Sequence, residues 1–186
     1  MRGTMHYCAF LRGINVGGHA LIKMEELKKA FVNMGFENVR TLLASGNVVF
    51  ETLQSDKEML TERIETELKR VFKKDIHVIL RSLDDLKALR SAEPFRGIKV
   101  APDIRLYVTF LSGKAKPRTI TIPFASARGE FRILRVAPRE VFSVVDLSKG
   151  KGTTEAMNIL EKEFGSNITT RNWNTILKIL GPTERA

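Results

Sequence analysis

The start of the chain alternates between apolar runs typical of strands and apolar spacings typical of helices. Residues 6–12 are apolar on both faces, which predicts a strand that is buried on both sides. The next apolar residues recur at intervals of three and four, as on one face of a helix: Met24, Leu27, Phe31 and Met34. Gly35 supplies a stop, so the pattern predicts a strand followed by a helix.

A hairpin and a second helix are predicted next. Residues 39–44 and 48–52 are short β-rich runs around Ser45-Gly46-Asn47, whose glycine and asparagine tolerate the positive φ of a tight turn. Ser55 and Glu58 have the spacing of a capping box and predict the start of a helix. Its apolar stripe consists of Leu60, Ile64, Leu68, Val71 and Phe72.

A strand predicted at 76–81 completes the order strand, helix, strand, strand, helix, strand, which is the ferredoxin-like pattern. Ser82 and Asp85 have the spacing that caps a short helix after this strand. Prolines then bracket a linker at 92–102.

The second half has a related pattern. Its predicted elements are a strand at 104–111, a loop or extended segment at 112–129, strands at 130–136 and 140–145, a helix from Thr153, an extended piece at 167–171, and a helix that begins near Trp173. This order resembles the first half with its first helix replaced. No residue-level repeat stands out, so a duplication remains a hypothesis.

We therefore predict an α+β fold in which a ferredoxin-like first half packs closely on a related, modified second half. The predicted parts are residues 1–91, a linker at 92–102, and residues 103–186. Because a lone ferredoxin-like unit leaves one sheet face open, the doubly apolar strands predict that residues 104–180 cover that face. RNA-recognition domains use the open face for stacking, and strand 48–52 lacks the basic-glycine-aromatic run that this mode needs.

Composition narrows the class of protein without naming a reaction. The 186 residues are 43% hydrophobic and 28% charged, which is typical of a globular chain that can bury its own core. No uncharged apolar run approaches the length of a membrane span, and no signal peptide is apparent. The single cysteine, Cys8, favours a cytoplasmic location, where thiols stay reduced.

The charge is concentrated in one stretch. The chain carries a net charge of +10, and residues 96–139 hold ten basic side chains against Asp103 and Glu130, a net +8. Such an excess favours an anionic partner, either a phosphate-bearing ligand or a nucleic acid. The alternative is a solvated surface that keeps the protein soluble.

The loop from Arg12 to His19 is the best candidate for a ligand site. It belongs to a connection of about ten residues, longer than most connections between a strand and a helix, and it contains Gly13, Gly17 and Gly18. Successive glycines let backbone N–H groups converge on an anion beside a helix N-terminus. The spacing matches neither a P-loop nor a dinucleotide fingerprint. The alternative is that the glycines only let the chain wrap around the sheet edge.

The predicted strand order brings further polar residues close to this loop. In the predicted fold the first strand ends at the same sheet edge as the hairpin turn, so Arg12, Asn15 and His19 should approach Ser45 and Asn47. Gly13, Gly17 and Gly18 complete this set of candidate ligand-binding residues. Lys73 and Lys74 belong to the same edge. Asp75 is the lone carboxylate there, which argues against catalysis by paired carboxylates.

Nucleophile and metal sites find little support. Cys8 lies among apolar residues and is interpreted as a small core side chain. His6, His19 and His77 show no metal-ligand spacing, so no metal is predicted. Trp173 has helical spacing with apolar residues and is interpreted as a packing anchor.

Three motifs together carry a family resemblance. They are Leu11-Arg12-Gly13-Ile14-Asn15-Val16-Gly17-Gly18, Ser45-Gly46-Asn47-Val48-Val49-Phe50 and Thr170-Arg171-Asn172-Trp173-Asn174-Thr175. In this order they resemble a bacterial family known as domain of unknown function 1697, over nearly the whole chain. The resemblance implies an α+β protein with a ferredoxin-like first half and a related second half, and it implies no reaction. Members often carry polar residues where this chain has Ala20-Leu21.

Three functional hypotheses follow. The first is a cytoplasmic protein that binds a phosphate-bearing ligand or nucleic acid through the glycine-rich loop and the basic surface. The second is an enzyme of unknown class that uses the same loop edge. The third is a protein-interaction module with a basic docking segment. Ligand identity, cofactor and oligomeric state stay open.

Overall fold

The computed structural model describes residues 3–16, 21–113, 115, 121–150 and 152–182. The chain divides into two compact units, Met1–Ala88 and Leu89–Ala186. We call them unit 1 and unit 2 and describe each by itself.

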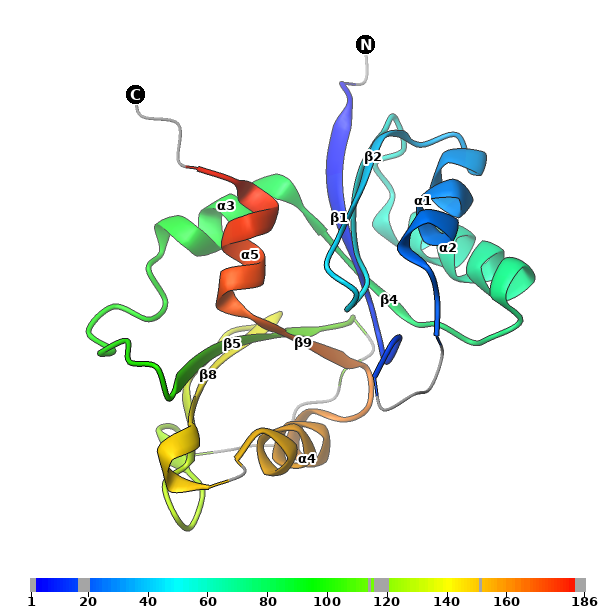
Figure 1. Cartoon of the computed structure of the whole chain (residues 1–186). Coiled ribbons are helices and arrows are strands. Elements are labelled where there is room, and N and C mark those ends of the chain that lie inside the picture. The colour runs from blue at the N-terminus through cyan, green and yellow to red at the C-terminus, as the bar shows by residue number, and fades with distance from the viewer. Residues whose placement is uncertain (1–2, 17–20, 114, 116–120, 151, 183–186) are drawn as a thin grey trace. The chain divides into compact units, whose positions relative to one another are not determined.

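Unit 1 contains a four-stranded antiparallel sheet and the helices that pack on it (Figure 1). Its elements are β1 (Met5–Leu11), α1 (Met24–Asn33), β2 (Glu37–Leu42), β3 (Asn47–Thr52), α2 (Lys57–Phe72), β4 (Val78–Ser82) and the start of α3 (Leu83–Ser91). The strand order β2-β3-β1-β4 is the ferredoxin-like order. The predicted fold of the first half is therefore confirmed.

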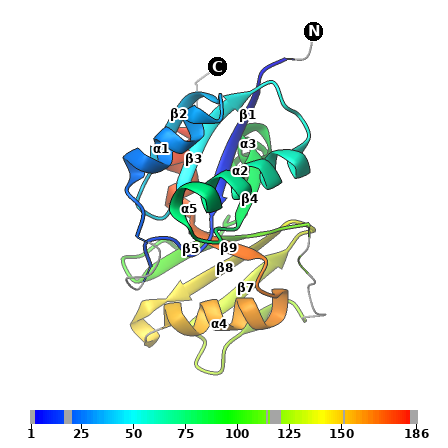
Figure 2. The same ribbon diagram turned by 90° about the vertical axis from the view of Figure 1, so that its right-hand side faces the viewer.

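The core of unit 1 lies between the sheet and the two helices α1 and α2, which Figure 2 shows on one face of the strands. Alternate residues of β1 point into it: Tyr7, Ala9 and Leu11. The helices add the stripes that their periodicity predicts, including Leu27, Phe31, Leu60, Ile64 and Leu68, all buried. Each such side chain contributes about 1.5–3 kcal/mol to folding.

Unit 2 repeats this topology with one change. Its elements are β5 (Ile104–Leu111), β6 (Phe124–Ala125), β7 (Phe131–Val136), β8 (Glu140–Asp146), a 3-10 turn (Leu147–Lys149), α4 (Gly152–Phe164), β9 (Ile168–Asn172) and α5 (Trp173–Leu180). The order β7-β8-β5-β9 corresponds to β2-β3-β1-β4, and a loop with the short β6 stands where unit 1 has α1. The α+β class and the relation between the halves are confirmed.

The strand registers reveal a residue-level repeat that the sequence pattern did not show. Arg81 of β4 pairs with Cys8, and Arg171 of β9 pairs with Val108, so Cys8 and Val108 are equivalent positions. Around them, 7–13 and 107–113 share tyrosine, phenylalanine, leucine and glycine at matching places. The repeat is easily missed because the segments that connect these strands differ between the units.

The helices α4 and α5 pack on the sheet of unit 2. Ala156, Leu160 and Phe164 of α4 are buried against one face of the sheet. α5 packs against β5 and β9, on the face away from α4 (Figure 1). There the ring of Trp173 meets that of Phe95 edge to face at 5.3 Å, which confirms its interpretation as a packing anchor.

Some predicted boundaries need correction. The N-cap of α2 is Asp56, whose carboxylate accepts hydrogen bonds from the backbone N–H groups of Glu58 and Met59, so the Ser55–Glu58 capping box is wrong. Ser55 and Asp56 are adjacent candidates for the N-cap, and the carboxylate of Asp56 is a stronger hydrogen-bond acceptor than the hydroxyl of Ser55. The capping interaction of Ser82 with Asp85 is confirmed.

Candidate functional site

The end of β1, the turn between β2 and β3, and the approach to β4 meet at one edge of the unit 1 sheet, as the topology predicts. The Leu11 N–H donates to the Gly46 carbonyl at 2.9 Å, and the Arg12 N–H donates to the His77 carbonyl at 2.8 Å. We call this region the loop edge: residues 12–16, 43–47 and 73–77. Gly17, Gly18 and His19 lie outside the described residues.

Asn15 uses its side-chain amide to close the loop. Its Nδ2 donates to the carbonyl of Ala44 at 2.8 Å and to that of Ile22 at 3.0 Å. Its Oδ1 accepts from the Ile22 N–H at 2.7 Å. The residue has a φ of +55°, which asparagine adopts more readily than most residues. Both ends of the amide therefore hold the chain in place, a structural role that the sequence analysis did not assign.

Asn47 has a similar role in the hairpin turn. It is fully buried, and its Nδ2 donates to the Leu42 carbonyl at 2.7 Å and to Ser45 Oγ at 3.1 Å. These contacts fix the turn from inside. The two asparagines predicted as ligand-binding residues thus bind protein groups.

Gly46 is required by close packing. Its φ is +76°, and a Cβ there would lie 2.5 Å from Cδ1 of Ile14. Gly13 also has a positive φ, of +67°, and open space where a Cβ would be. At Gly46 the structure favours the interpretation that glycine lets the loop and the turn pack together.

The groups that the loop edge presents to solvent include more cations than carboxylates. Lys73, Lys74 and His77 are exposed and Arg12 is half-buried. Lys73 ends α2 in a left-handed conformation with a φ of +54°. The carboxylate of Asp75 lies 2.8 Å from the ammonium of Lys69, whose hydrogen bond lowers the pKa of Asp75. The edge is therefore basic.

The basic stretch of unit 2 is exposed where the structure describes it. Its exposed arginines include Arg128, Arg132, Arg135 and Arg139, on or beside β7. The guanidinium of Arg135 lies 4.8 Å from the centroid of the Phe142 ring, a cation–π contact that leaves the charge accessible. Lys114, Lys116 and Arg118 lie outside the described residues.

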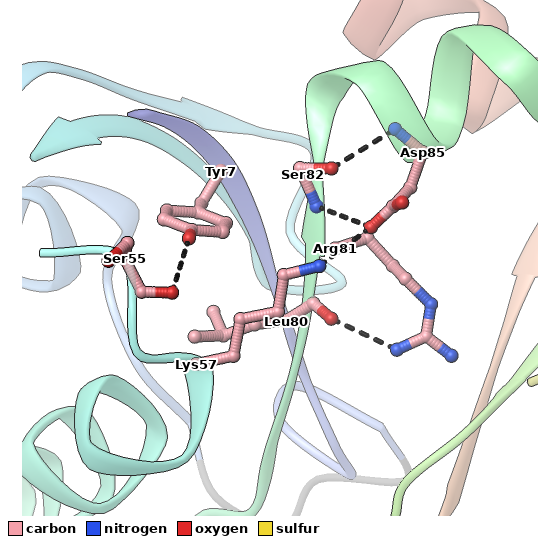
Figure 3. A network of polar contacts seen from close by, with 7 residues as sticks. All are labelled: Tyr7, Ser55, Lys57, Leu80, Arg81, Ser82 and Asp85. Carbon is pink, nitrogen blue, oxygen red and sulfur yellow. Dashed lines mark hydrogen bonds and ion pairs between the residues drawn. The ribbon is translucent and has the colours of Figure 1, made fainter. Parts of the chain in front are cut away.

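A polar network at the start of α3 is structural (Figure 3). The carboxylate of Asp85 accepts from Lys57 Nζ at 2.9 Å and from the Ser82 N–H at 3.2 Å. Burial opposes the charge of Asp85, but these bonds outweigh it and lower its pKa to about 2. The Tyr7 hydroxyl donates to the Ser55 carbonyl at 3.3 Å, and burial, together with the charges of Asp85 and Asp56, raises the pKa of Tyr7.

Unit 2 holds a carboxyl pair that the sequence analysis missed. Glu130 precedes β7 and Glu155 lies in the first turn of α4, so their proximity follows only from the fold. A backbone N–H, the Glu155 carboxyl and the Ser126 hydroxyl, 3.0 Å from Oε2, hold the pKa of Glu130 down. The hydrogen bond to Glu130 and its charge raise the pKa of Glu155. The pKa values of the two carboxyls are therefore shifted in opposite directions.

Cys8 is also a candidate for a reactive side chain. It is in no disulfide and is fully buried, which confirms its interpretation as a core residue. Among the described residues, no group of three or more His, Cys, Asp or Glu side chains has the arrangement of a metal site. Likewise, no helix in the described part of the chain has the length and apolar character needed to cross a membrane.

Fold and residues together define a class: a two-unit α+β protein whose first unit is ferredoxin-like. A family model described as "Protein of unknown function (DUF1697)" matches residues 5–142. The chain belongs to this family, as the three motifs of the sequence indicate.

Two known proteins are similar to the chain. The structure of the conserved bacterial protein SP0830 from Streptococcus pneumoniae superposes with a TM-score of 0.72 at 23% identity, over 95% of this chain and 97% of that one. This likeness shows the fold. The large ribosomal subunit protein uL22 of Fervidobacterium nodosum is 37% identical over 65 residues. That match covers 35% of this chain and 43% of the ribosomal protein, less than half of either.

Proposed function

We propose that the protein binds a phosphate-bearing ligand and that a nucleic acid is the class of ligand that suits it best. The observation that carries the proposal is the exposed cations of the loop edge, Lys73 and Lys74, with Arg12 and the exposed imidazole of His77 on the same edge. Unit 2 adds the exposed arginines on or beside β7. A ligand that carries many phosphates in a row can be held by each of these groups of cations.

Backbone donors are the second source of support. Gly13 has a positive φ, and apart from its chain neighbours no atom of the described residues lies within 4 Å of where its Cβ would be, so a ligand can approach the main chain closely there. The amides of Asn15 and Asn47 are engaged with protein groups. We therefore assign contact with phosphate to cations and main-chain N–H groups, with the asparagines holding the loop in shape.

Two further points bear on the proposal. The ribosomal relative makes RNA a natural first probe. We also propose that the protein is cytoplasmic, since this location would give it access to RNA and to soluble nucleotides. Cell fractionation would check that location.

The test is fluorescence anisotropy with labelled single-stranded RNA and DNA of equal length, at low and moderate salt. Binding should weaken steeply as salt rises, with a slope of about −0.7 per phosphate contacted. The Lys73→Gln/Lys74→Gln double variant should bind more weakly and show a shallower slope. Lys162→Gln, an exposed cation on α4, serves as the matched control and should bind like the parent.

Two results would overturn the proposal. One is no binding of RNA, DNA or inorganic tripolyphosphate at low salt by a folded protein. The other is binding that the double variant leaves unchanged. Binding to neither nucleic acid nor phosphate would favour the protein-interaction hypothesis.

A further inference from the structure

A groove lies at the β2 edge of the unit 1 sheet. Its volume is about 760 Å³, and its apolar wall includes Val32, Phe36 and Val49. Five polar side chains line it: His6, Lys28, Asn38, Arg40 and Glu51. His6 and Leu11 stand near opposite ends of β1. At about 3.3 Å per residue His6 lies some 16 Å from Leu11, while Arg40 and Val49 lie only about 7–10 Å along their strands from residues 43–47, so the groove and the loop edge are neighbouring regions with different residues.

His6 lies beside a carboxylate in this groove. It pairs across the sheet with Glu51, whose Oε1 lies 3.2 Å from the imidazole Nδ1. The other carboxylate oxygen accepts from Asn38 Nδ2 at 2.8 Å. Nδ1 therefore faces the carboxylate, which leaves Nε2 as the ring nitrogen directed away from Glu51. Half of the His6 side chain, 52%, is exposed, so a ligand can reach the ring.

Two cations complete the groove. Lys28 lies on α1 and Arg40 on β2, and both are exposed. Neither side chain has an ion pair or hydrogen bond with another described residue. The register of β2 against β3 shifts between Glu37 and Arg40, and Asn38 has a φ of +48°. Such a bulge redirects side chains at a sheet edge. With the single carboxylate of Glu51 engaged by His6 and Asn38, the groove has an excess of positive charge.

We propose that this groove binds a small phosphate monoester. Lys28 and Arg40 hold the phosphate oxygens, and Nε2 of His6 accepts a hydrogen bond from a P–OH or sugar hydroxyl of the ligand. The apolar wall suits the carbon part of such a molecule. Glu51 and Asn38 are positioning residues, since they act through the imidazole. This groove differs from the loop edge in two ways: it takes a smaller ligand, and its histidine, His6, lies beside the carboxylate of Glu51.

The test is an NMR titration of the full-length protein, with the imidazole nitrogens of His6 and His77 observed as inorganic phosphate and then glycerol 2-phosphate are added. Nε2 of His6 should shift and saturate for both probes. Arg40→Gln and Lys28→Gln should each weaken the apparent affinity roughly tenfold, as expected for one lost charged contact. Arg12→Gln and Lys73→Gln, at the loop edge, should leave the His6 titration unchanged.

Several outcomes separate this site from the loop edge. A shift of His77 with His6 unmoved would overturn the groove while supporting a phosphate site at the loop edge. A His6 shift that does not saturate, or that survives in the Lys28→Gln/Arg40→Gln double variant, would also overturn it. In that case the His6–Glu51 contact serves only as a cross-strand pair. Loss of the His6 response in Glu51→Gln, with folding retained, would confirm its positioning role.

Discussion

At the scale of single residues, an asparagine at the loop edge fits two different roles, that of a turn residue and that of a ligand-binding residue. Asparagine suits a turn because it tolerates positive φ, and it suits a ligand site because it both donates and accepts hydrogen bonds. Asn15 and Asn47 direct their amides to main-chain carbonyls. These contacts fix the shape of the loop, and ligand binding by the two residues stays a prediction.

Replacing Asn47 with alanine should destabilise the fold. The change leaves the Leu42 carbonyl without the donor 2.7 Å away, inside a buried turn. We expect a loss of about 1–3 kcal/mol in the free energy of unfolding, the usual penalty for an unsatisfied buried group. Urea unfolding followed by circular dichroism measures it. Asn33→Ala, at an exposed position, is the control. Equal stabilities of the two variants would contradict the assigned role of Asn47.

At the scale of elements, hydrogen bonds at helix starts tie α3 and α4 to residues that the sequence places far away. Asp85 caps α3 together with Ser82 and also meets Lys57 at the start of α2. Glu155 in the first turn of α4 meets Glu130, which precedes β7. Both contacts make the stability of the units depend on pH, in opposite directions.

Asp85→Ala should destabilise the protein at neutral pH and matter less in acid. The pKa of Asp85 is lowered from 3.8 to about 2, so its contribution is present above pH 3.8 and is lost as pH falls through 2. We expect a loss of about 1 kcal/mol at neutral pH, typical of a removed helix cap. Thermal unfolding across this pH range measures it. Asp84→Ala, an exposed neighbour, should change stability less; an equal effect at every pH would contradict the assignment.

Glu155→Gln should stabilise the protein at neutral pH. The folded-state pKa of Glu155 is raised, so its carboxyl favours folding below its ordinary pKa, and that contribution is lost as pH rises. Glutamine can still donate to Glu130 and carries no charge to repel it. A higher Tm at neutral pH, with a smaller gain in acid, is the expected result. Glu163→Gln on the same helix should show no such pH dependence, and a similar gain there would contradict the prediction.

At the scale of the whole molecule, the two units share one strand order and one set of core positions in their central strands. The shared tyrosine, phenylalanine and leucine of β1 and β5 occupy equivalent places, and a buried arginine stands on each equivalent edge strand, Arg81 and Arg171. A duplicated unit whose first helix was replaced accounts for this pattern.

A fragment of residues 1–91 should not behave as an independent domain. α1 and α2 cover the face of the sheet that holds Tyr7, Ala9 and Leu11. The other face of this sheet carries the apolar residues Cys8, Phe10, Val49 and Ile79. We expect the fragment to aggregate or to bind a hydrophobic dye, because this many apolar side chains need cover. A soluble, monomeric fragment with a cooperative unfolding transition would show that the expectation is wrong.

Much of the fold could be predicted because it depends on patterns local in sequence. Alternation and three-to-four spacing located the strands and helices, for example β5 at 104–111 and the helix that begins near Trp173. Two neighbouring N-cap candidates were harder to distinguish, as Ser55 and Asp56 at the start of α2 show. The repeat was hidden because it depends on strand pairing and is interrupted by connections of different length.

The sequence by itself determined the α+β class, the ferredoxin-like order of the first half, the burial of Cys8 and the basic character of the chain, since each follows from local periodicity or from composition. Only the tertiary structure decided how the polar groups are used. Asn15 and Asn47 close a loop, Glu130 meets Glu155, and His6 meets Glu51 across two strands. These contacts join residues far apart in the chain, and their partners are fixed by strand register and helix packing, which no local pattern specifies.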